Sequence, residues 1–583
     1  MDTVRTEEPA GARAAASPSG LAQASHKARW VVLAVTLSAV FMQLLDTTIT
    51  MVALPELQND LGATFAQVQL VVAVYSLAFA CTLVTGGRLG DIHGRKKLFL
   101  IGMTGFTLAS ALCGAAPGST FLILARVFQG ICSGLMFPQV LSIIQVTFAP
   151  QERAKALGAY GASVGLGTVL GPVLGGWLID LDIMGADWRS IFFVNVPVGL
   201  LALLVGWVKI PESKGEGGHK LDVVGAVILT AGLFSLILPL VIGREQDWPG
   251  WSLVLLGLSP LVLLGFAAYE KMLTDRPDGA PLVPMGLFRE RSFSVGLLIS
   301  LVFFAGVPSY FMTFFLTFQV GFGYSPVSAG AVSLGFALLI AVGSARSAAV
   351  VKRLGKWTLS LGAGLLLIGI TGVMVTVDQV GTGLHGYQLI PSLMVAGIGG
   401  GLFLAPCTGI MLAGIKSRQA GSASGVLATA QQVGIAVGIA VAGILFFGLL
   451  GSNADGSSAS VVPQLRSDLT AAGVPADRQE EVVKGFTTCF GDRMNQKDLT
   501  ETPASCARIE KEVADSPAPP EVKEKVRAAV LESAVPEARK ANFSDSFAQV
   551  AFWQLGCFSL SCLLVLALPK IRPEDVTDVG AAA

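Results

Sequence analysis

Long apolar stretches separated by short polar segments dominate this sequence of 583 residues. A helix needs about 20 mostly apolar residues to cross the hydrocarbon core of a bilayer. Fourteen stretches have that character: 30–52, 66–86, 98–116, 121–148, 156–179, 191–210, 222–242, 251–269, 293–319, 327–350, 358–377, 388–415, 422–450 and 549–568. Because unpaired backbone groups are costly in lipid, each stretch must satisfy them internally. The sequence therefore predicts an all-α polytopic membrane protein with fourteen transmembrane helices.

Composition agrees with this prediction and excludes several other classes of protein. The chain is 52% hydrophobic and only 14% charged, whereas soluble domains carry about 25% charged residues. The formal net charge is zero, which gives no indication of nucleic-acid binding. No phosphate-binding or metal-ligand spacing and no nucleophile-base arrangement stands out. We therefore expect no enzyme activity, no metal and no cofactor.

The distribution of Lys and Arg predicts the orientation in the membrane. With the N-terminus inside, the cytoplasmic segments carry most of these cations, whereas the short outer loops contain only Arg189 and Arg244. Residues 1–29 are polar and lack a signal-peptide cleavage site, so we expect a retained, disordered cytoplasmic tail. Residues 570–583 form a second cytoplasmic tail. The predicted location is the cell membrane, where the chain spans the bilayer many times.

Internal repetition divides the chain into two halves. The motif Gly-Ile-x-x-Gly-Leu at 130–135 recurs at 397–402, and Gly-Arg-Lys at 94–96 is echoed by Gly-Lys at 355–356, about 265 residues later. Chance similarity between glycine-rich helices is the alternative explanation. We interpret the pattern as two six-helix bundles, 30–210 and 293–569, in the same topology. Residues 211–292 then form a linker with two extra helices.

One long polar segment, 451–547, lies outside the membrane by this topology. Parts of it have helical apolar spacing with charge pairs four residues apart, which favours a small helical cap over an unstructured linker. Cys489 and Cys506 are its only cysteines. Because paired cysteines persist as disulfides in an oxidising environment, we predict a bridge between them.

A glycine- and cation-rich segment, 86–97, separates the second and third apolar stretches. Its sequence is Gly-Gly-Arg-Leu-Gly-Asp-Ile-His-Gly-Arg-Lys-Lys. Glycine permits turns that are too tight for a side chain, and cations are favourable at the cytoplasmic face but costly in lipid. This pattern predicts a cytoplasmic hairpin between two membrane helices.

Two ionisable side chains lie in the interior of predicted spans. At 1.5 Å per residue, Asp46 and Arg126 both lie roughly 8–9 Å below the outer ends of their helices. Charged groups inside lipid are costly, so each is a candidate functional residue. The pair is either a structural ion pair between two helices or a site at which one member titrates during transport.

Other candidates are polar, small or aromatic. Gly167, Gly171 and Gly175 recur every four residues and predict a close, bendable seam beside Pro172, either a gate between the halves or generic packing. The glutamines at 43, 129, 139, 431 and 432 line a cavity or form interhelical hydrogen bonds. The aromatic residues of 293–319, Tyr310 among them, contact lipid or form a wall for planar or cationic substrates.

Several motifs resemble those of the major facilitator superfamily, in particular its fourteen-helix drug:proton antiporter branch. They are Gly87-x-Leu-x-Asp91-x-x-Gly94-Arg95-Lys, Leu-Asp46-Thr-Thr-Ile-x-x-Val-Ala-Leu-Pro, Arg126-x-x-Gln129-Gly and Gly161-x-x-x-Gly165-x-Gly167-x-x-x-Gly171-Pro172-x-x-Gly175-Gly. The resemblance covers nearly every predicted helix. It implies that the loop with Gly87, Asp91, Gly94 and Arg95 is a conformational latch and that the helix with Gly165 marks an antiporter.

The resemblance also implies a function. We expect a monomeric, proton-coupled antiporter that exports drugs, antibiotics or other amphipathic molecules, with Asp46 as the proton-coupling carboxylate and Arg126 as its partner. The proton gradient supplies the energy. The candidate substrate cavity comprises Gln43, Gln129, Gln139, Gln432 and Tyr310. Export of one endogenous metabolite, or a non-transporting receptor or scaffold with the same fold, are the alternatives.

Overall fold

The computed structural model describes residues 26–63, 65–182, 185–214, 221–244, 246–276, 279–413, 415, 419–496, 502–516 and 518–569, and all its regular elements there are helices. The first half contains α1 (His26–Val52), α2 (Leu54–Leu61), α3 (Phe65–His93), α4 (Arg95–Gly114), α5 (Ser119–Thr147), α6 (Pro150–Asp180), η2 (Asp187–Arg189), α7 (Ser190–Phe193) and α8 (Asn195–Lys209). The inserted pair is α9 (Val223–Ile242) and α10 (Gly250–Thr274), followed by η3 (Met285–Arg289).

The remaining elements form the second half and the cap. They are α11 (Arg291–Leu316), η4 (Thr317–Gly321), α12 (Pro326–Leu354), α13 (Trp357–Val380), η5 (Gly381–Gly383), η6 (Gly386–Leu389), α14 (Ile390–Ala413), α15 (Ala420–Ala471), α16 (Ala476–Met494), α17 (Ala504–Asp515), α18 (Pro520–Arg527), η8 (Ala528–Ala534) and α19 (Val535–Leu566). The two predicted tails lie outside the described residues, except that α1 already begins at His26.

Within the described residues, thirteen segments are long and apolar enough to cross a membrane. The predicted span at 156–179 corresponds to α6, which is 31 residues long but is not among those thirteen. The total of fourteen transmembrane helices therefore stays a prediction.

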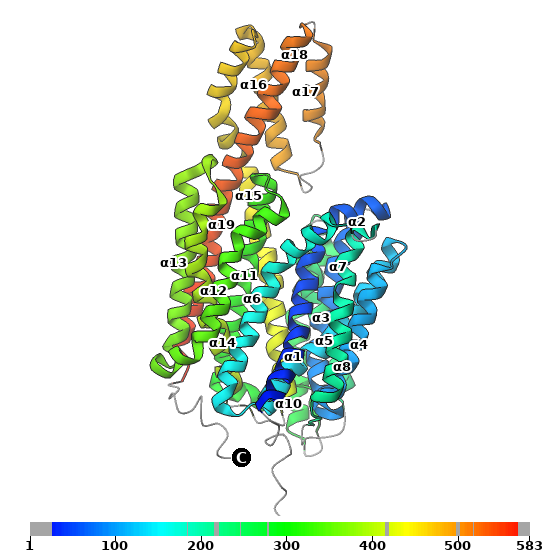
Figure 1. The fold of residues 1–583 in the computed structure, drawn as a ribbon. Helices are drawn as coiled ribbons and strands as arrows, with labels where there is room; N and C mark the ends of the chain where they lie inside the picture. The colour runs from blue at the N-terminus through cyan, green and yellow to red at the C-terminus, as the bar shows by residue number, and fades with distance from the viewer. Residues whose placement is uncertain are drawn as a thin grey trace, which may run out of the picture.

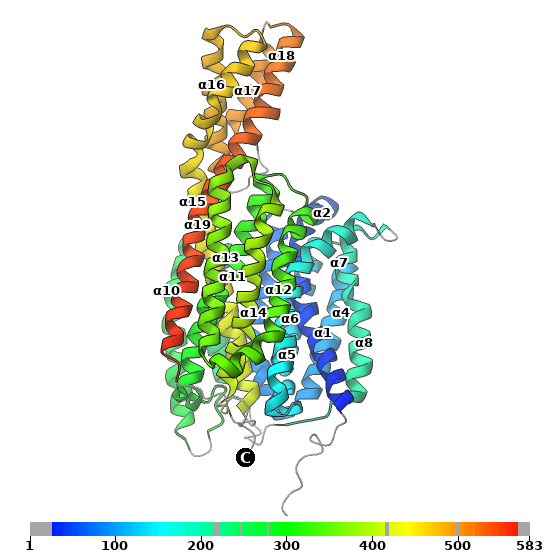
Figure 2. The same ribbon diagram turned by 60° about the vertical axis from the view of Figure 1, so that its left-hand side comes forward.

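The two halves repeat the same packing arrangement. In the first half α5 packs against α3 and α4, and α1 packs against α6; in the second, α14 packs against α12 and α13, and α11 packs against α15. The contacts between the halves follow the same repeat, because α6 of the first half packs against α12 of the second and α15 of the second packs against α3 of the first. Figures 1 and 2 show the resulting two groups of helices side by side. The inserted helix α9 packs against α3, α15 and its partner α10.

The cap is continuous with the membrane helices. The predicted end of the thirteenth span, at residue 450, is wrong, because α15 runs unbroken from Ala420 to Ala471. The predicted start of the fourteenth span, at residue 549, is also wrong, because α19 begins at Val535. The sequence becomes polar at these positions, but a change in polarity does not interrupt backbone hydrogen bonding. Figure 1 shows α16, α17 and α18 projecting beyond the bundle, at the end opposite the one where α19 ends. The cap is helical, as predicted, and Cys489 and Cys506 are joined in a disulfide within it.

The glycine- and cation-rich segment is a narrower turn than predicted. Helix α3 continues to His93, and Gly94 alone leaves the helical conformation, with a φ of 111°. Gly86 and Gly87 therefore lie inside a helix. A Cβ atom at Gly86 would clash with the backbone of Gly134, and one at Gly87 would clash with the backbone of Gly421. These two glycines permit close helix packing rather than the turn itself.

Candidate functional site

Asp46 and Arg126 form a completely buried ion pair inside the first half. Asp46 lies on α1 and Arg126 on α5, and both side chains have no exposed surface. The Arg126 Nη1 atom donates to Asp46 Oδ2 across 2.5 Å. The equal depths inferred from the sequence thus correspond to a direct contact between the two charged groups.

Two amide side chains hold the other oxygen of the same carboxylate. Gln129 Nε2 donates to Asp46 Oδ1 across 2.9 Å, and Asn195 Nδ2 donates to it across 3.2 Å. Both amides also donate to Ser110 Oγ, at 2.8 and 3.2 Å respectively. Asp46 therefore receives three donors, from α5 and from the start of α8, so that both oxygens of this buried carboxyl group are hydrogen-bonded.

The Arg126 guanidinium is fixed by four neighbours. Its Nε donates to the Val71 carbonyl oxygen across 3.1 Å, and its Nη1 also donates to Gln129 Oε1 across 2.8 Å. Its carbon Cζ lies 4.1 Å from the centre of the Tyr75 ring, within the range of a cation–π interaction. Among the described residues, Nη2 has no hydrogen-bond partner. Both N–H donors of Nη2 on this buried cation are thus left for a water molecule or a substrate group.

Asn195, Ser110 and Tyr75 belong to this site, although the sequence analysis did not single them out. The search for intramembrane candidates considered ionisable groups and glutamines. Asn195 satisfies the same criterion as the glutamines, because it is an amide within the predicted span 191–210. Ser110 and Tyr75 had no such signal, since single hydroxyl groups are common in membrane helices.

Two of the five predicted cavity residues form hydrogen bonds between helices. Gln129 belongs to the ion-pair network, and Gln139 is buried and donates to the Gly86 carbonyl oxygen across 2.9 Å. Gln43 is buried near Tyr75 and Gln432 is half-buried on α15. For Gln129 and Gln139 the alternative of interhelical hydrogen bonding is therefore correct.

Tyr310 lies in an aromatic core of the second half. Phe303, Tyr310, Phe311 and Phe314 of α11 and Phe318 of η4 are all buried, so the interpretation as lipid contacts is wrong for them. Their rings contact aromatic residues of neighbouring helices: the Phe303 and Phe403 centroids are 4.4 Å apart, those of Phe311 and Phe336 4.8 Å, and those of Tyr310 and Phe547 5.8 Å. Within the described chain the Tyr310 hydroxyl has no hydrogen-bond partner.

Asp91 connects the two halves at their cytoplasmic ends. It is 1% exposed and its carboxylate accepts hydrogen bonds from the backbone amides of Gly421 and Ser422, across 3.2 and 3.1 Å. Arg95 Nη2 donates to it across 3.0 Å. Asp91 was expected to face the cytoplasm, but it is buried because it caps the first turn of α15, where free amides and the helix dipole favour an anion.

The glycines of α6 divide between two faces of the helix. Thr48 Oγ1 on α1 donates to the Gly167 carbonyl oxygen across 3.4 Å, and a Cβ atom at Gly171 would clash with Thr48. The stripe of Gly167 and Gly171 thus packs within the first half, and its assignment to a gate between the halves is wrong. Successive helical residues differ by about 100°, so Gly165 faces the opposite way, against Ile340 of α12. The backbone at Pro172 and Gly175 continues the same helix.

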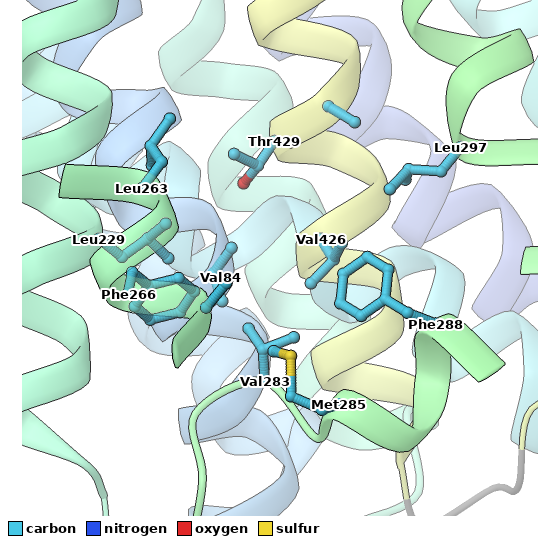
Figure 3. A pocket seen from close by; sticks show the side chains of 12 residues that line it. Val84, Leu229, Leu263, Phe266, Val283, Met285, Phe288, Leu297, Val426 and Thr429 are labelled. Carbon is cyan, nitrogen blue, oxygen red and sulfur yellow. The ribbon is translucent and has the colours of Figure 1, made fainter. Parts of the chain in front are cut away.

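An apolar cavity of about 460 Å³ lies between the inserted helices and both halves. Figure 3 shows side chains from α3, α9, α10, α11 and α15, together with Val283, Met285 and Phe288, around one space. The lining residues are Val84, Leu229, Leu263, Phe266, Ala267, Val283, Met285, Phe288, Leu297, Val426, Thr429 and Ala430. Its volume falls within the range of about 300–1,000 Å³ that is common for small-molecule sites. None of the five predicted cavity residues lines it.

The sequence match to a known family extends over most of the chain. Residues 36–439 match the profile of the Major Facilitator Superfamily. This protein belongs to that superfamily. As a Major Facilitator Superfamily member whose described part contains thirteen segments able to span a bilayer, it is a multi-pass membrane transporter and not an enzyme.

Several superfamily relatives carry names that concern antibiotics. The chain is 37% identical to the "Probable actinorhodin transporter" of Streptomyces coelicolor, over 99% of this chain and 100% of that one. It is 32% identical to the "Tetracenomycin C resistance and export protein" of Streptomyces glaucescens, over 77% of this chain and 81% of the relative. Identity to the "Puromycin resistance protein pur8" of Streptomyces alboniger is 35%, over 73% and 83% of the two chains.

A solved superfamily structure supports the fold. The proton:xylose symporter XylE matches with a TM-score of 0.50 and 15% identity, over 70% of this chain and 87% of that chain. At this identity the similarity concerns the fold alone. The packing of α3, α4 and α5 against one another recurs in α12, α13 and α14. This repeat and the similarity in fold agree with the predicted major facilitator arrangement of two helix bundles.

Proposed function

We propose that this transporter exports antibiotics, drugs or other amphipathic small molecules in exchange for protons, as a monomer and without a cofactor. The observation that carries the proposal is the buried Asp46–Arg126 pair, which has a carboxylate at a depth where lipid penalises charge. Names of several relatives support the substrate class.

The donors around Asp46 support the proposal of proton coupling. In the described conformation three hydrogen bonds stabilise the carboxylate in its charged form. A movement of α1 relative to α5 that separates Asp46 from Arg126 leaves a buried carboxylate without its main counter-charge, and such a group binds a proton. Return of α1 restores the ion pair and releases the proton to the other side.

Alternating access requires that the halves part at one end while they close at the other. Asp91 binds the start of α15 at the cytoplasmic end, and the α6 face with Gly158, Gly161 and Gly165 packs against α12. We assign the first contact the role of a latch that opens during each cycle. The second provides a close seam along which the halves tilt.

A second candidate is the dedicated export of one endogenous metabolite. The relative that matches 99% of this chain, cap included, is named for a single compound, whereas the tetracenomycin C and puromycin proteins match 77% and 73% of it. A susceptibility panel of chemically diverse compounds, with actinorhodin, tetracenomycin C and puromycin among them, distinguishes the two. Protection against one compound only supports the dedicated exporter.

Substrate-induced proton release from purified protein in proteoliposomes tests the mechanism. We expect wild type to release protons when substrate is added, and Asp46→Asn to lose this release and proton-driven export while it still binds substrate. Asp492→Asn, an exposed carboxyl in the cap, is the matched control and should behave as wild type. Coupled exchange at the wild-type rate in Asp46→Asn would show that another group carries the proton.

A further inference from the structure

The inserted helices α9 and α10 are joined at their cytoplasmic ends by two acidic side chains. Asp222 is the N-cap of α9, and its Oδ1 accepts hydrogen bonds from the Gly225 amide across 2.9 Å and from the Tyr269 hydroxyl across 3.2 Å. Glu270 lies on α10, next to Tyr269, and its Oε2 accepts a hydrogen bond from the Val283 amide across 3.1 Å. One oxygen of each carboxyl group is thus fully engaged.

The other two oxygens face each other and lack donors. Glu270 has no exposed surface and Asp222 is 9% exposed. Asp222 Oδ2 and Glu270 Oε1 are both buried without a hydrogen-bond donor anywhere in the described chain. A Cβ atom added at Gly225 would clash with both oxygens, so they border the same small space.

No cation compensates this pair among its described neighbours. The titratable groups that face it are Asp222, Glu270 and Tyr269, while Lys271 on α10 and Arg276 just beyond the end of that helix are exposed. The packed segment 279–285 contains no charged residue. Two ionised carboxylates facing each other in a buried site repel strongly, whereas one proton between them turns repulsion into a hydrogen bond.

We propose that Asp222 and Glu270 bind one shared proton, which forms a second proton site outside the two six-helix bundles. This inference is independent of the role of Asp46. The proton enters from the cytoplasmic side, where the start of α9 and the end of α10 lie. It forms an O–H bond with one carboxyl oxygen and a hydrogen bond with the other, and no other bond forms or breaks.

The shared proton also affects the apolar cavity. Phe266, one turn before Glu270 on α10, lines that cavity, and so does Val283, whose amide Glu270 holds. Figure 3 shows both side chains among those that surround the space. Loss of the proton makes α9 and α10 repel and weakens the hold on the segment from Val283 to Met285. Proton occupancy at the carboxyl pair therefore controls how firmly this wall of the cavity is fixed.

Infrared spectroscopy of the purified full-length protein tests the shared proton directly. At neutral pH we expect a carbonyl stretching band from a protonated carboxyl group, and we expect both Asp222→Asn and Glu270→Gln to lose one carboxyl equivalent of it. Either amide can donate to the remaining carboxylate, which then stays ionised. Glu290→Gln removes an exposed carboxyl nearby and should leave the band unchanged.

Two infrared results would overturn the proposal. An unchanged band in both variants means that both groups are ionised, and a loss in Glu270→Gln alone means that Glu270 holds a proton without Asp222. Thermal unfolding provides a second measurement, because Glu270→Gln mimics the protonated pair. We expect the Tm of wild type to fall relative to that of Glu270→Gln as the pH rises from the range in which free carboxyl groups ionise to the pH at which the folded pair loses its proton, with Glu290→Gln following wild type. Parallel pH profiles for wild type and Glu270→Gln would also contradict it.

Discussion

Asp91 and Ser422, 331 residues apart in the sequence, join the two halves of the transporter through a hydrogen bond of 3.1 Å. The Ser422 amide belongs to the first turn of α15, and Asp91 belongs to the last turns of α3. Because a carboxylate at a helix N-terminus interacts with both free amides and the helix dipole, this contact stabilises the conformation in which the two helix ends are together.

Replacement of Asp91 should therefore affect the transport cycle more than substrate binding. Asp91→Asn keeps a weaker acceptor but removes the charge, and capping interactions are worth about 1 kcal/mol. We expect a lower turnover rate with nearly unchanged substrate affinity. Transport assays and equilibrium binding on the same preparation measure the two quantities, and Asp275→Asn, an exposed cytoplasmic carboxyl, is the control. A matching loss of affinity would place Asp91 in the binding site instead.

Gly425 tests the close approach of α15 to α3. A Cβ atom at this position would lie 2.8 Å from the Leu83 carbonyl oxygen and 2.9 Å from Val84 Cα, both backbone atoms that cannot move aside independently. We expect Gly425→Ala to separate the helices at the cytoplasmic end and to reduce export. Gly448→Ala is the matched control, since Gly448 lies on the same helix with no atom within 4 Å of an added Cβ.

The control has its own expected outcome. Alanine is favoured over glycine within a helix by about 0.5–1 kcal/mol, so Gly448→Ala should export normally and unfold at the same temperature as wild type or slightly above it. Equal export by both variants would mean that the α3–α15 contact is not part of the cycle.

The features that the sequence predicted well depend on position along one helix. Asp46 and Arg126 could be matched because depth in the membrane follows from residue number and rise per residue. The repeat could be found because equivalent helices keep a constant offset. The glycine stripe of α6 was equally visible, but a stripe specifies only that something packs closely there. Which helix packs there depends on tertiary contacts, and Gly167 faces α1 whereas Gly165 faces α12.

Burial of polar groups was harder to predict. The segment with Asp91 is cationic and polar, and the sequence places it at the cytoplasmic face, yet its carboxylate is buried by the start of α15 from the other half. The end of α15 and the start of α19 were predicted wrongly for another reason, because both helices continue where the sequence changes from apolar to polar. For Asp91 the deciding interaction comes from residues far away in the sequence, whereas the continuity of α15 and α19 depends on backbone hydrogen bonds between residues four apart.

Arg126 should not be replaceable by lysine. The guanidinium donates at once to Asp46, Gln129 and the Val71 carbonyl oxygen, a forked arrangement that an ammonium group cannot reproduce. We expect Arg126→Lys to lose most substrate-induced proton release. Arg126→Ala should in addition lower the free energy of unfolding by about 3–5 kcal/mol, because it leaves the Asp46 carboxylate buried without its partner.

Proton release and thermal unfolding measure these two effects separately. Arg346→Ala, which removes an exposed arginine of α12, is the control and should change neither strongly. Wild-type proton release by Arg126→Lys would show that a positive charge near Asp46 is sufficient and that the fork is not required.

The disulfide should stabilise the cap locally without affecting transport. It joins α16 to α17, and α17 has only 12 residues, a length at which isolated helices are marginal in water. The other cap helices need this bridge less, because α15 and α19 continue into the membrane bundle. Closure of a loop with a sequence separation of 17 residues contributes about 3 kcal/mol in the chain-entropy model.

Cys489→Ser should therefore make α17 sensitive to added protease in intact cells or outward-oriented vesicles, while export continues. Cys562→Ser, a free cysteine of α19, should keep both properties, and resistance of Cys489→Ser to the protease would show that packing alone holds α17 in place.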